Sequence, residues 1–250
     1  MYRCLWPLLF ALSASAVSAE TLRIGFGTNK PPYVFEGENR GLEFDIVAAA
    51  LREAGYDMEV RHAPMERLHL ALRRGQLDGI ATTNPSSGIE AHYSATYIHY
   101  HNQAVALSSR DYRIDSITDL GGYSISSFQR SRYLLGGEFQ AMADANPHYR
   151  EEALQINRNR LLYSGRVDVV IGDPRILRYF NPQVADQVDV SQPLTFYALF
   201  PPTPYSVGFR QPLQRDRFDQ GLQAIRDSGE YLQIERRYAD YRGARLRIFR

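Results

Sequence analysis

Apolar and polar positions alternate in short runs along most of the chain, and glycine-rich turns separate the runs. From residue 20 the order is strand, helix, strand, helix, strand. The predicted strands cover residues 21–27, 57–62 and 77–82, and the predicted helices cover 43–54 and 65–74. Strands that alternate with helices are typical of a mainly parallel sheet with helices on both faces.

The same kind of pattern begins again after a strand at 103–107. The prediction for this part comprises strands at 123–127, 154–156, 167–171 and 205–209, and helices at 133–145, 158–163, 213–225 and 231–238. The sequence therefore predicts a second α/β unit.

One short sequence motif occurs in both halves of the chain. Residues 72–80 read LRRGQLDGI and residues 162–170 read LYSGRVDVV, which is the end of a helix, a glycine that stops it, and an apolar strand with one aspartate. Glycine suits the stop because it enters the left-handed conformation without a Cβ penalty. The repeat predicts two lobes of one plan that face each other across a cleft, and it assigns Asp78 and Asp168 to structure.

Residues 1–19 have the composition of a secretory signal peptide. They contain one arginine, Arg3, an apolar run too short to span a bilayer, and the sequence VSA directly before Glu20. We expect cleavage after Ala19 and a periplasmic location. Cys4 is the only cysteine, so the exported protein has no disulfide and depends on a packed core.

The charge of the chain is balanced. It has 29 basic and 28 acidic residues, and removal of Arg3 makes the exported protein neutral, which argues against a nucleic-acid partner. Lys30 is the only lysine, which we attribute to base composition. The six histidines lack metal-ligand spacing, so we expect neither a metal nor another cofactor.

An ordered set of motifs resembles the periplasmic solute-binding proteins of bacterial ABC transporters, in particular the family 3-like group that binds amino acids. The set covers essentially the whole mature chain. It comprises PPYVF at 31–35, GLEFDI at 41–46, the first repeat at 72–80, YSATY at 93–97, DLGG at 119–122, residues 165–173, YSVGF at 205–209 and DSGEY at 227–231.

The resemblance implies a type II-like periplasmic-binding-protein fold, in which two α/β lobes joined by two crossing hinge strands close over a solute. It places lobe 1 at residues 20–103 and 208–250, and lobe 2 at 104–207. It also implies a monomer without enzymatic activity that captures a small polar solute, an amino acid or a related molecule, for the membrane subunits of an ABC transporter.

Two alternatives to transport stay open. One is an exported enzyme on the same scaffold that resembles cyclohexadienyl dehydratase, with Glu43 or Asp173 as the catalytic acid. The other is a ligand-sensing partner of a membrane receptor.

Candidate solute contacts follow two strands of the first lobe. Tyr33 and Phe35 occupy the loop where the family places an aromatic ring against the solute, and the alternative is that both cap the core. Thr82, Thr83 and Asn84 end the third strand, where short polar side chains can reach a ligand. The alternative for Asn84 is turn formation with the proline that follows it.

The chain departs from the family where amino-acid binders carry Thr-Pro-x-Arg, whose arginine grips the solute carboxylate; residues 84–88 read NPSSG instead. Two replacements are open. Arg67 lies at the start of a predicted helix, and Arg130, Ser131 and Arg132 follow a strand of the second lobe, where two arginines favour an anionic solute. The alternative for each arginine is a solvated surface charge.

Asp173 ends the strand of the second repeat. In amino-acid binders of this family an aspartate in this position accepts hydrogen bonds from the solute's ammonium group. Pro174 is a favourable first helical residue, so the alternative is that Asp173 caps a helix, and the two roles are compatible.

Overall fold

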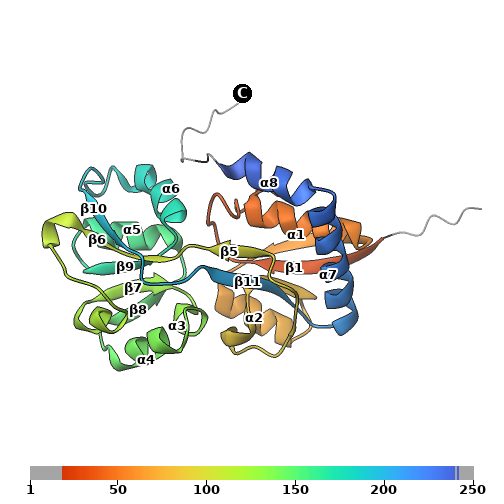
Figure 1. The fold of residues 1–250 in the computed structure, drawn as a ribbon, viewed down its shortest axis with the longest axis horizontal. Coiled ribbons are helices and arrows are strands. Elements are labelled where there is room, and N and C mark those ends of the chain that lie inside the picture. The colour runs from red at the N-terminus through yellow and green to blue at the C-terminus, as the bar shows by residue number, and fades with distance from the viewer. Residues whose placement is uncertain (1–18, 240, 242–250) are drawn as a thin grey trace, which may run out of the picture.

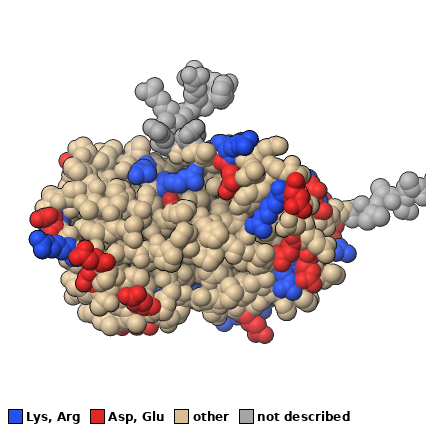
Figure 2. Space-filling model, in the orientation of Figure 1, with Lys and Arg blue, Asp and Glu red and all other residues tan. Residues whose placement is uncertain are grey.

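Two sheets with helices on both faces form the two lobes of the computed structural model, which describes residues 19–239 and 241 (Figure 1). Residues 1–18 of the predicted signal peptide and residues 242–250 of the C-terminal tail lie outside the described residues. Among the described residues no helix is both long and apolar enough to cross a membrane. Acidic and basic side chains lie intermixed on the face shown in Figure 2.

The first sheet has the strand order β2-β1-β3-β11-β4, and β5 also pairs with β11. Its strands are β1 (Glu20–Phe26), β2 (Tyr56–His62), β3 (Gly79–Thr83), β4 (His92–Tyr93), β5 (Ile98–Tyr100) and β11 (Thr203–Phe209). Four helices cover it: α1 (Leu42–Glu53), α2 (Met65–Arg73), α7 (Pro212–Asp227) and α8 (Glu230–Ala239). In Figure 1, α1 and α8 lie on one side of this sheet and α2 on the other.

The second sheet has the order β10-β6-β9-β7-β8. Its strands are β6 (Gln103–Leu107), β7 (Ile125–Phe128), β8 (Tyr149–Glu152), β9 (Val169–Gly172) and β10 (Leu194–Tyr197). The helices of this lobe are α3 (Ser131–Leu134), α4 (Gly137–Ala145), α5 (Gln155–Tyr163) and α6 (Pro174–Val184). The 3₁₀ helices among the described residues are η1 (Pro85–Ser87), η2 (Ser108–Arg110) and η3 (Thr118–Gly122).

Alternation along β9 explains the layers of the second lobe. Val169 and Ile171 pack on one face with Phe139 of α4, whereas Val170 packs on the other face with Leu162 of α5. A strand with helices on both sides is apolar throughout, which is why the sequence pattern identified it.

The α/β fold with two lobes is confirmed, but both sheets are mixed rather than mainly parallel. The chain passes between the lobes twice, from β5 to β6 and from β10 to β11 (Figure 1). Strand β11 runs antiparallel to β3, and β6 runs antiparallel to β9. Each lobe therefore combines a parallel set of strands with at least one strand that runs the opposite way.

Strand β11 passes through the lobe boundary expected at residue 208. It begins at Thr203, and Ser206 already pairs with Thr83 of β3 in the first sheet. We propose that the second crossing between the lobes lies in the segment between β10 and β11.

The sequence repeat corresponds to equivalent structure in both lobes. Gly75 and Gly165 end their helices with φ angles of 68° and 67°. The Asp78 carboxylate accepts a hydrogen bond from the backbone N–H of Arg23 at 3.0 Å, and Asp168 accepts one from Ser124 at 2.9 Å. Each aspartate ties its loop to the neighbouring strand, as the structural interpretation predicts.

Two predicted elements of the second lobe were wrong. Residues 154–156 are not a strand, because α5 begins at Gln155 and the strand beside it is β8. Strand β8 is the edge of its sheet and half exposed, so it lacks the apolar alternation used for the prediction. The single helix expected at 133–145 is two helices, because Gly136 interrupts it with a φ of 97°.

Candidate functional site

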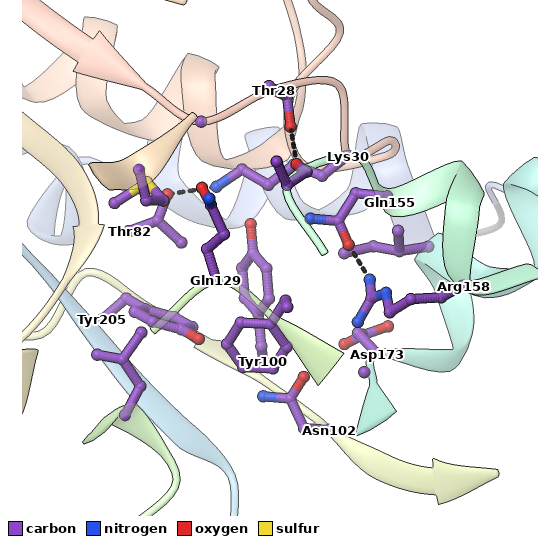
Figure 3. A pocket seen from close by; sticks show the side chains of 17 residues that line it. Thr28, Lys30, Thr82, Tyr100, Asn102, Gln129, Gln155, Arg158, Asp173 and Tyr205 are labelled. Carbon is purple, nitrogen blue, oxygen red and sulfur yellow. Dashed lines mark hydrogen bonds between the residues drawn. The ribbon is translucent and has the colours of Figure 1, made fainter. Parts of the chain in front are cut away.

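A cavity of about 50 Å³ lies between the two lobes (Figure 3). Its polar lining comes from both lobes and comprises Thr28, Lys30, Thr82, Tyr100, Asn102, Gln129, Gln155, Arg158, Asp173 and Tyr205. The apolar lining comprises Met65, Phe128, Leu134 and Ile176. Thr82 ends β3, Phe128 ends β7 and Asp173 follows β9, so the cavity lies beyond the carboxyl ends of strands from both sheets, where α/β proteins bind ligands.

Direct contacts hold the lobes together around this cavity. The Tyr33 hydroxyl donates to Asp173 Oδ2 at 2.8 Å, and the Thr28 hydroxyl donates to the carbonyl of Ala153 at 3.0 Å. Arg130 of the second lobe forms an ion pair with Glu66 of α2 at 3.1 Å. In this closed arrangement the cavity of about 50 Å³ is small.

Lys30 and Glu43 form a buried ion pair at the wall of the first lobe. The Lys30 Nζ lies 2.7 Å from Glu43 Oε2, and Glu43 also accepts hydrogen bonds from the hydroxyls of Thr82, Tyr97 and Tyr100. Burial lowers the pKa of Lys30. Burial alone raises the pKa of Glu43, but the Lys30 ammonium and the neighbouring hydroxyls hold this pKa below its ordinary value. Glu43 is therefore a carboxylate whose acceptor sites are occupied.

The network also stabilises an unusual backbone conformation at Thr82. This residue has a φ of 57°, although threonine is β-branched and disfavours the left-handed region. Its N–H donates to the Tyr97 hydroxyl at 2.9 Å, while its side chain bonds Lys30 and Glu43. Strained residues of this kind often mark functional sites, and here the strain directs the Thr82 side chain to the cavity wall.

Arg158 of α5 provides a buried cation in the second lobe. The residue is 5% exposed, and its guanidinium donates to the carbonyl of Ile171 and to Gln155 Oε1. Burial lowers its pKa to about 10, which keeps the group charged at neutral pH. Among the described residues no carboxylate lies within ion-pair distance of Arg158, although Glu152 and Asp173 raise its pKa from further away. A buried charge of this kind is costly unless an anion joins it.

Asp173 lies opposite Lys30 in the wall and caps α6. Its Oδ1 accepts the Arg175 N–H at 2.8 Å, and its Oδ2 accepts both the Tyr33 hydroxyl and the His101 N–H at 3.0 Å. The helix-capping interpretation is thus confirmed, and the carboxylate is already bonded by groups of both lobes.

The other first-lobe candidates lie behind the cavity wall. Tyr33 stacks on Tyr100 with the ring centroids 3.8 Å apart, and Phe35 packs against Tyr179. Thr83 is fully buried. Asn84 caps η1 and donates to the carbonyl of Pro204. Of the first-lobe candidates, Thr82 lines the cavity.

Neither replacement suggested for the missing arginine lies in the cavity lining. Arg67 is exposed on α2. Arg130 joins the lobes through Glu66, and Arg132 pairs with Asp144 at 3.1 Å.

The second-lobe loop also lacks space for a solute anion at its helix. Glu151 of β8 accepts the backbone N–H groups of Arg130 at 2.7 Å and Arg132 at 3.2 Å, and the Ser131 hydroxyl at 3.4 Å. The protein's own carboxylate therefore occupies the position where the family resemblance led us to expect a solute carboxylate.

Sequence reasoning missed the two cations of the cavity. Lys30 carries one signal, since it is the only lysine of the chain and follows the first strand directly. Arg158 lies four residues before Leu162, which is fully buried, so both face the same side of α5. A charged residue on the apolar face of a helix is the signal that could have identified Arg158. Among the described residues no group of three or more His, Cys, Asp or Glu side chains could hold a metal ion.

Comparisons with known proteins agree with this geometry. The family model of bacterial extracellular solute-binding proteins, family 3, matches residues 22–241. Among curated proteins, none matches the chain by sequence.

Three solved structures illustrate the similarity of fold. An ancestral arginine-binding protein bound to arginine is 20% identical with a TM-score of 0.72, over 88% of this chain and 99% of that one. A histidine kinase sensor domain with similarity to periplasmic binding proteins is 18% identical with a TM-score of 0.73, over 89% and 97%. The ancestral amino acid-binding protein AncCDT-1, a precursor of cyclohexadienyl dehydratase, is 19% identical with a TM-score of 0.66, over 87% and 95%.

At these identities the solved structures show the fold alone, whereas the family model spans nearly all of the described chain. The two-lobed architecture, the cavity at the carboxyl ends of the strands and this match lead to one conclusion: the chain belongs to the bacterial extracellular solute-binding proteins of family 3.

Proposed function

We propose that the protein is an exported monomer that captures a small polar solute with an anionic group between its lobes and delivers it to an ABC transporter. The observation that carries this proposal is Arg158, a buried guanidinium in the wall of the cavity with no carboxylate in ion-pair contact among the described residues. An arginine fork matches a carboxylate in shape and charge, so an acid in the cavity supplies the missing partner.

The contacts between the lobes support a mechanism of capture by closure. Solute binding stabilises the closed state only if it adds contacts that the open state lacks. Lys30 reaches the cavity from the first lobe and Arg158 from the second (Figure 3). A solute that contacts both cations makes its full set of interactions in the closed state, because each lobe supplies one of them.

Transport is the role that we favour over catalysis. Glu43 has its pKa lowered and its oxygens bonded, so it is a poor proton donor at neutral pH. Asp173 caps a helix and accepts three hydrogen bonds. A mass spectrum of a bound solute after prolonged incubation tests this point: recovery of the unchanged compound supports binding, and conversion of prephenate or arogenate supports an enzyme.

Presentation of the closed state to a membrane receptor begins with the same capture step. Uptake of labelled solute by cells with and without the protein distinguishes the two roles, since loss of uptake on deletion supports transport.

Calorimetric titration with small amino acids, hydroxy acids, oxo acids and dicarboxylates tests the role of Arg158. We expect the variant Arg158→Gln to bind the preferred acid about 30-fold more weakly or worse, because a buried solute charge loses its partner. Arg158→Lys should bind with intermediate affinity, since it keeps the charge and loses the fork.

The matched control is Arg160→Gln, which removes a cation from the same helix. Arg160 bonds Gln187 and Asn157 rather than the cavity, so this variant should bind as the parent does. Circular dichroism and thermal unfolding establish that each variant is folded. Equal binding by folded Arg158→Gln and the parent would contradict the proposal.

A further inference from the structure

The oxygens of Asp173 have little capacity left for a solute. A carboxylate offers about four acceptor positions. In this protein three are used: Oδ1 accepts the Arg175 N–H, and Oδ2 accepts the Tyr33 hydroxyl and the His101 N–H. An ammonium group has three N–H donors. Only one of them can bond the free acceptor position of Asp173, and the other two need acceptors elsewhere.

The first-lobe carboxylate of the site is also unavailable to an ammonium group. Glu43 is fully buried, accepts from Lys30 and from three hydroxyls, and does not line the cavity. Neither acidic side chain close to the cavity therefore presents a vacant pair of oxygens.

Donors dominate the rest of the polar lining. Arg158 donates only to Ile171 and Gln155 in the described structure, and a guanidinium has five N–H groups. Lys30 bonds Glu43 and Thr82, which leaves a third ammonium proton at the cavity wall. Gln129 is an exception, because its buried side-chain oxygen has no partner and needs a donor such as a solute hydroxyl. A solute rich in acceptors, with a single donor for Gln129, satisfies this wall better than a solute that brings the three donors of an ammonium group.

The size of the cavity limits the solute as well. A cavity of about 50 Å³ in the closed arrangement favours a molecule with a short carbon chain. The lining also includes the apolar side chains Met65, Leu134 and Ile176, against which a short chain can pack.

We infer that the solute is a short carboxylic acid that carries an oxygen, as a hydroxyl or a carbonyl, rather than an ammonium group beside its carboxylate. Its carboxylate binds Arg158 and its second oxygen accepts from the Lys30 side of the cavity. The inference rests on the proposed function of this cavity and specifies the class of solute that the cavity takes.

Calorimetry with matched three-carbon acids tests the inference: L-alanine, L-lactate, D-lactate and pyruvate differ only at the carbon beside the carboxylate. A second series of L-aspartate, L-malate and oxaloacetate extends the chain by one carboxylate. In at least one series we expect the hydroxy or oxo acid to bind at least about tenfold more tightly than the amino acid, as expected for an ammonium group that lacks partners.

The outcomes separate this inference from the function on which it rests. Amino acids that bind as tightly as their oxygen counterparts, or more tightly, overturn the inference and leave solute capture intact. Absence of binding in both series, with binding of another solute such as a polyamine, overturns the inference and the anionic class together. Absence of binding by any small polar solute overturns the proposed function.

The variant Tyr33→Phe tests the physical cause. It removes the hydroxyl that occupies Asp173 Oδ2 and keeps the ring that stacks on Tyr100. Because one acceptor position becomes free for an ammonium group, the affinity for alanine relative to lactate should rise about threefold to tenfold.

The matched control is Tyr112→Phe, which removes a comparable bond from a tyrosine hydroxyl to Asp168 at 2.6 Å outside the cavity. It should leave the affinity ratio unchanged. A folded Tyr33→Phe variant with the parent ratio would show that Asp173 is not the source of the selectivity, which contradicts the inference.

Discussion

At the scale of single residues, the buried charges of this protein are of two kinds. Lys30 and Glu43 neutralise each other, whereas Arg158 has hydrogen bonds but no carboxylate in ion-pair contact within the described chain. A paired buried charge adds specificity to a fold, and an incompletely paired one indicates where a ligand completes it. In the proposed site Arg158 is therefore the cation that a solute acid neutralises, whereas Lys30, already paired with Glu43, offers the solute a hydrogen-bond donor.

His69 provides a prediction on stability against pH. It is 4% exposed, and both ring nitrogens lack hydrogen-bond partners. Burial, with help from Arg130 and Arg73 and against Glu66, lowers the pKa of His69 from 6.5 to about 4. The unfolded chain binds the His69 proton more tightly than the folded chain does. The free energy of unfolding is therefore highest above pH 6.5 and falls by about 3 kcal/mol as the pH decreases to about 4.

The variant His69→Leu should therefore lose part of the decline in unfolding free energy between pH 6.5 and 4, measured by urea titration at several pH values. His92→Gln, at an exposed histidine, is the control and should keep the parent slope. Equal slopes for His69→Leu and the parent would show that His69 titrates normally in the folded state.

At the scale of elements, the contact between α1 and α7 depends on one glycine. A Cβ placed on Gly221 of α7 would overlap the carbonyl oxygen of Ala50 in α1. The helices approach so closely that no side chain fits between them. Alanine normally stabilises a helix relative to glycine by about 1 kcal/mol. The sign of the change in unfolding free energy on substitution of Gly221 therefore tells whether this helix propensity or the overlap with α1 is larger.

We expect Gly221→Ala to destabilise the protein by about 1–3 kcal/mol, because the overpacked methyl group separates the two helices. The measurement is urea unfolding at neutral pH. Gln220→Ala, at the neighbouring exposed position, should change the unfolding free energy by less than about 0.5 kcal/mol. Stabilisation by Gly221→Ala would mean that the helices separate without cost.

The elements also show how far the sequence determines such a fold. The series from β1 to β3 was predicted because these strands and helices bury regular apolar faces. Strand β10 was missed because it is an edge strand without a buried side. The start of α6 was suggested by Asp173 and Pro174, but its extent was missed because the helix contains Pro182. Their conformation depends on neighbours that are distant in sequence.

The candidate site was less predictable than the fold, for a related reason. Thr82 and Asp173 were identified because they end recognisable strands. Arg158 was not, because its position in the cavity depends on how α5 packs across the second sheet. Arg130 and Arg132 after β7 were considered as solute ligands. Their backbone N–H groups instead donate to Glu151 of β8, a strand that the sequence pattern did not predict.

At the scale of the whole molecule, closure of the lobes can be followed at a single atom. Lys30 is the only lysine of the 250 residues and is 5% exposed in the closed arrangement. Because Lys30 lines the cavity between the lobes, we expect an amine reagent to reach it when the lobes separate, so that its modification measures opening.

We expect reductive methylation of Lys30, followed by peptide mass spectrometry, to be slow in the native protein and to slow further in proportion to the fraction of protein that has bound acid. The α-amino terminus is the internal control, since its rate should not depend on the acid. Modification of Lys30 at the rate of a free lysine, with or without acid, would contradict closure over this site.

The buried guanidinium of Arg158 has a consequence for the proposed delivery of solute at the membrane. Closure of an empty molecule would enclose a guanidinium that has hydrogen bonds but no carboxylate in ion-pair contact, at a cost of several kcal/mol, whereas closure over a bound acid would enclose a neutral pair. In the proposed role a single arginine would thus make the closed shape depend on bound solute. If the protein serves an ABC transporter, as we propose, a permease that recognises only the closed shape would meet few empty carriers and would hydrolyse little ATP on them.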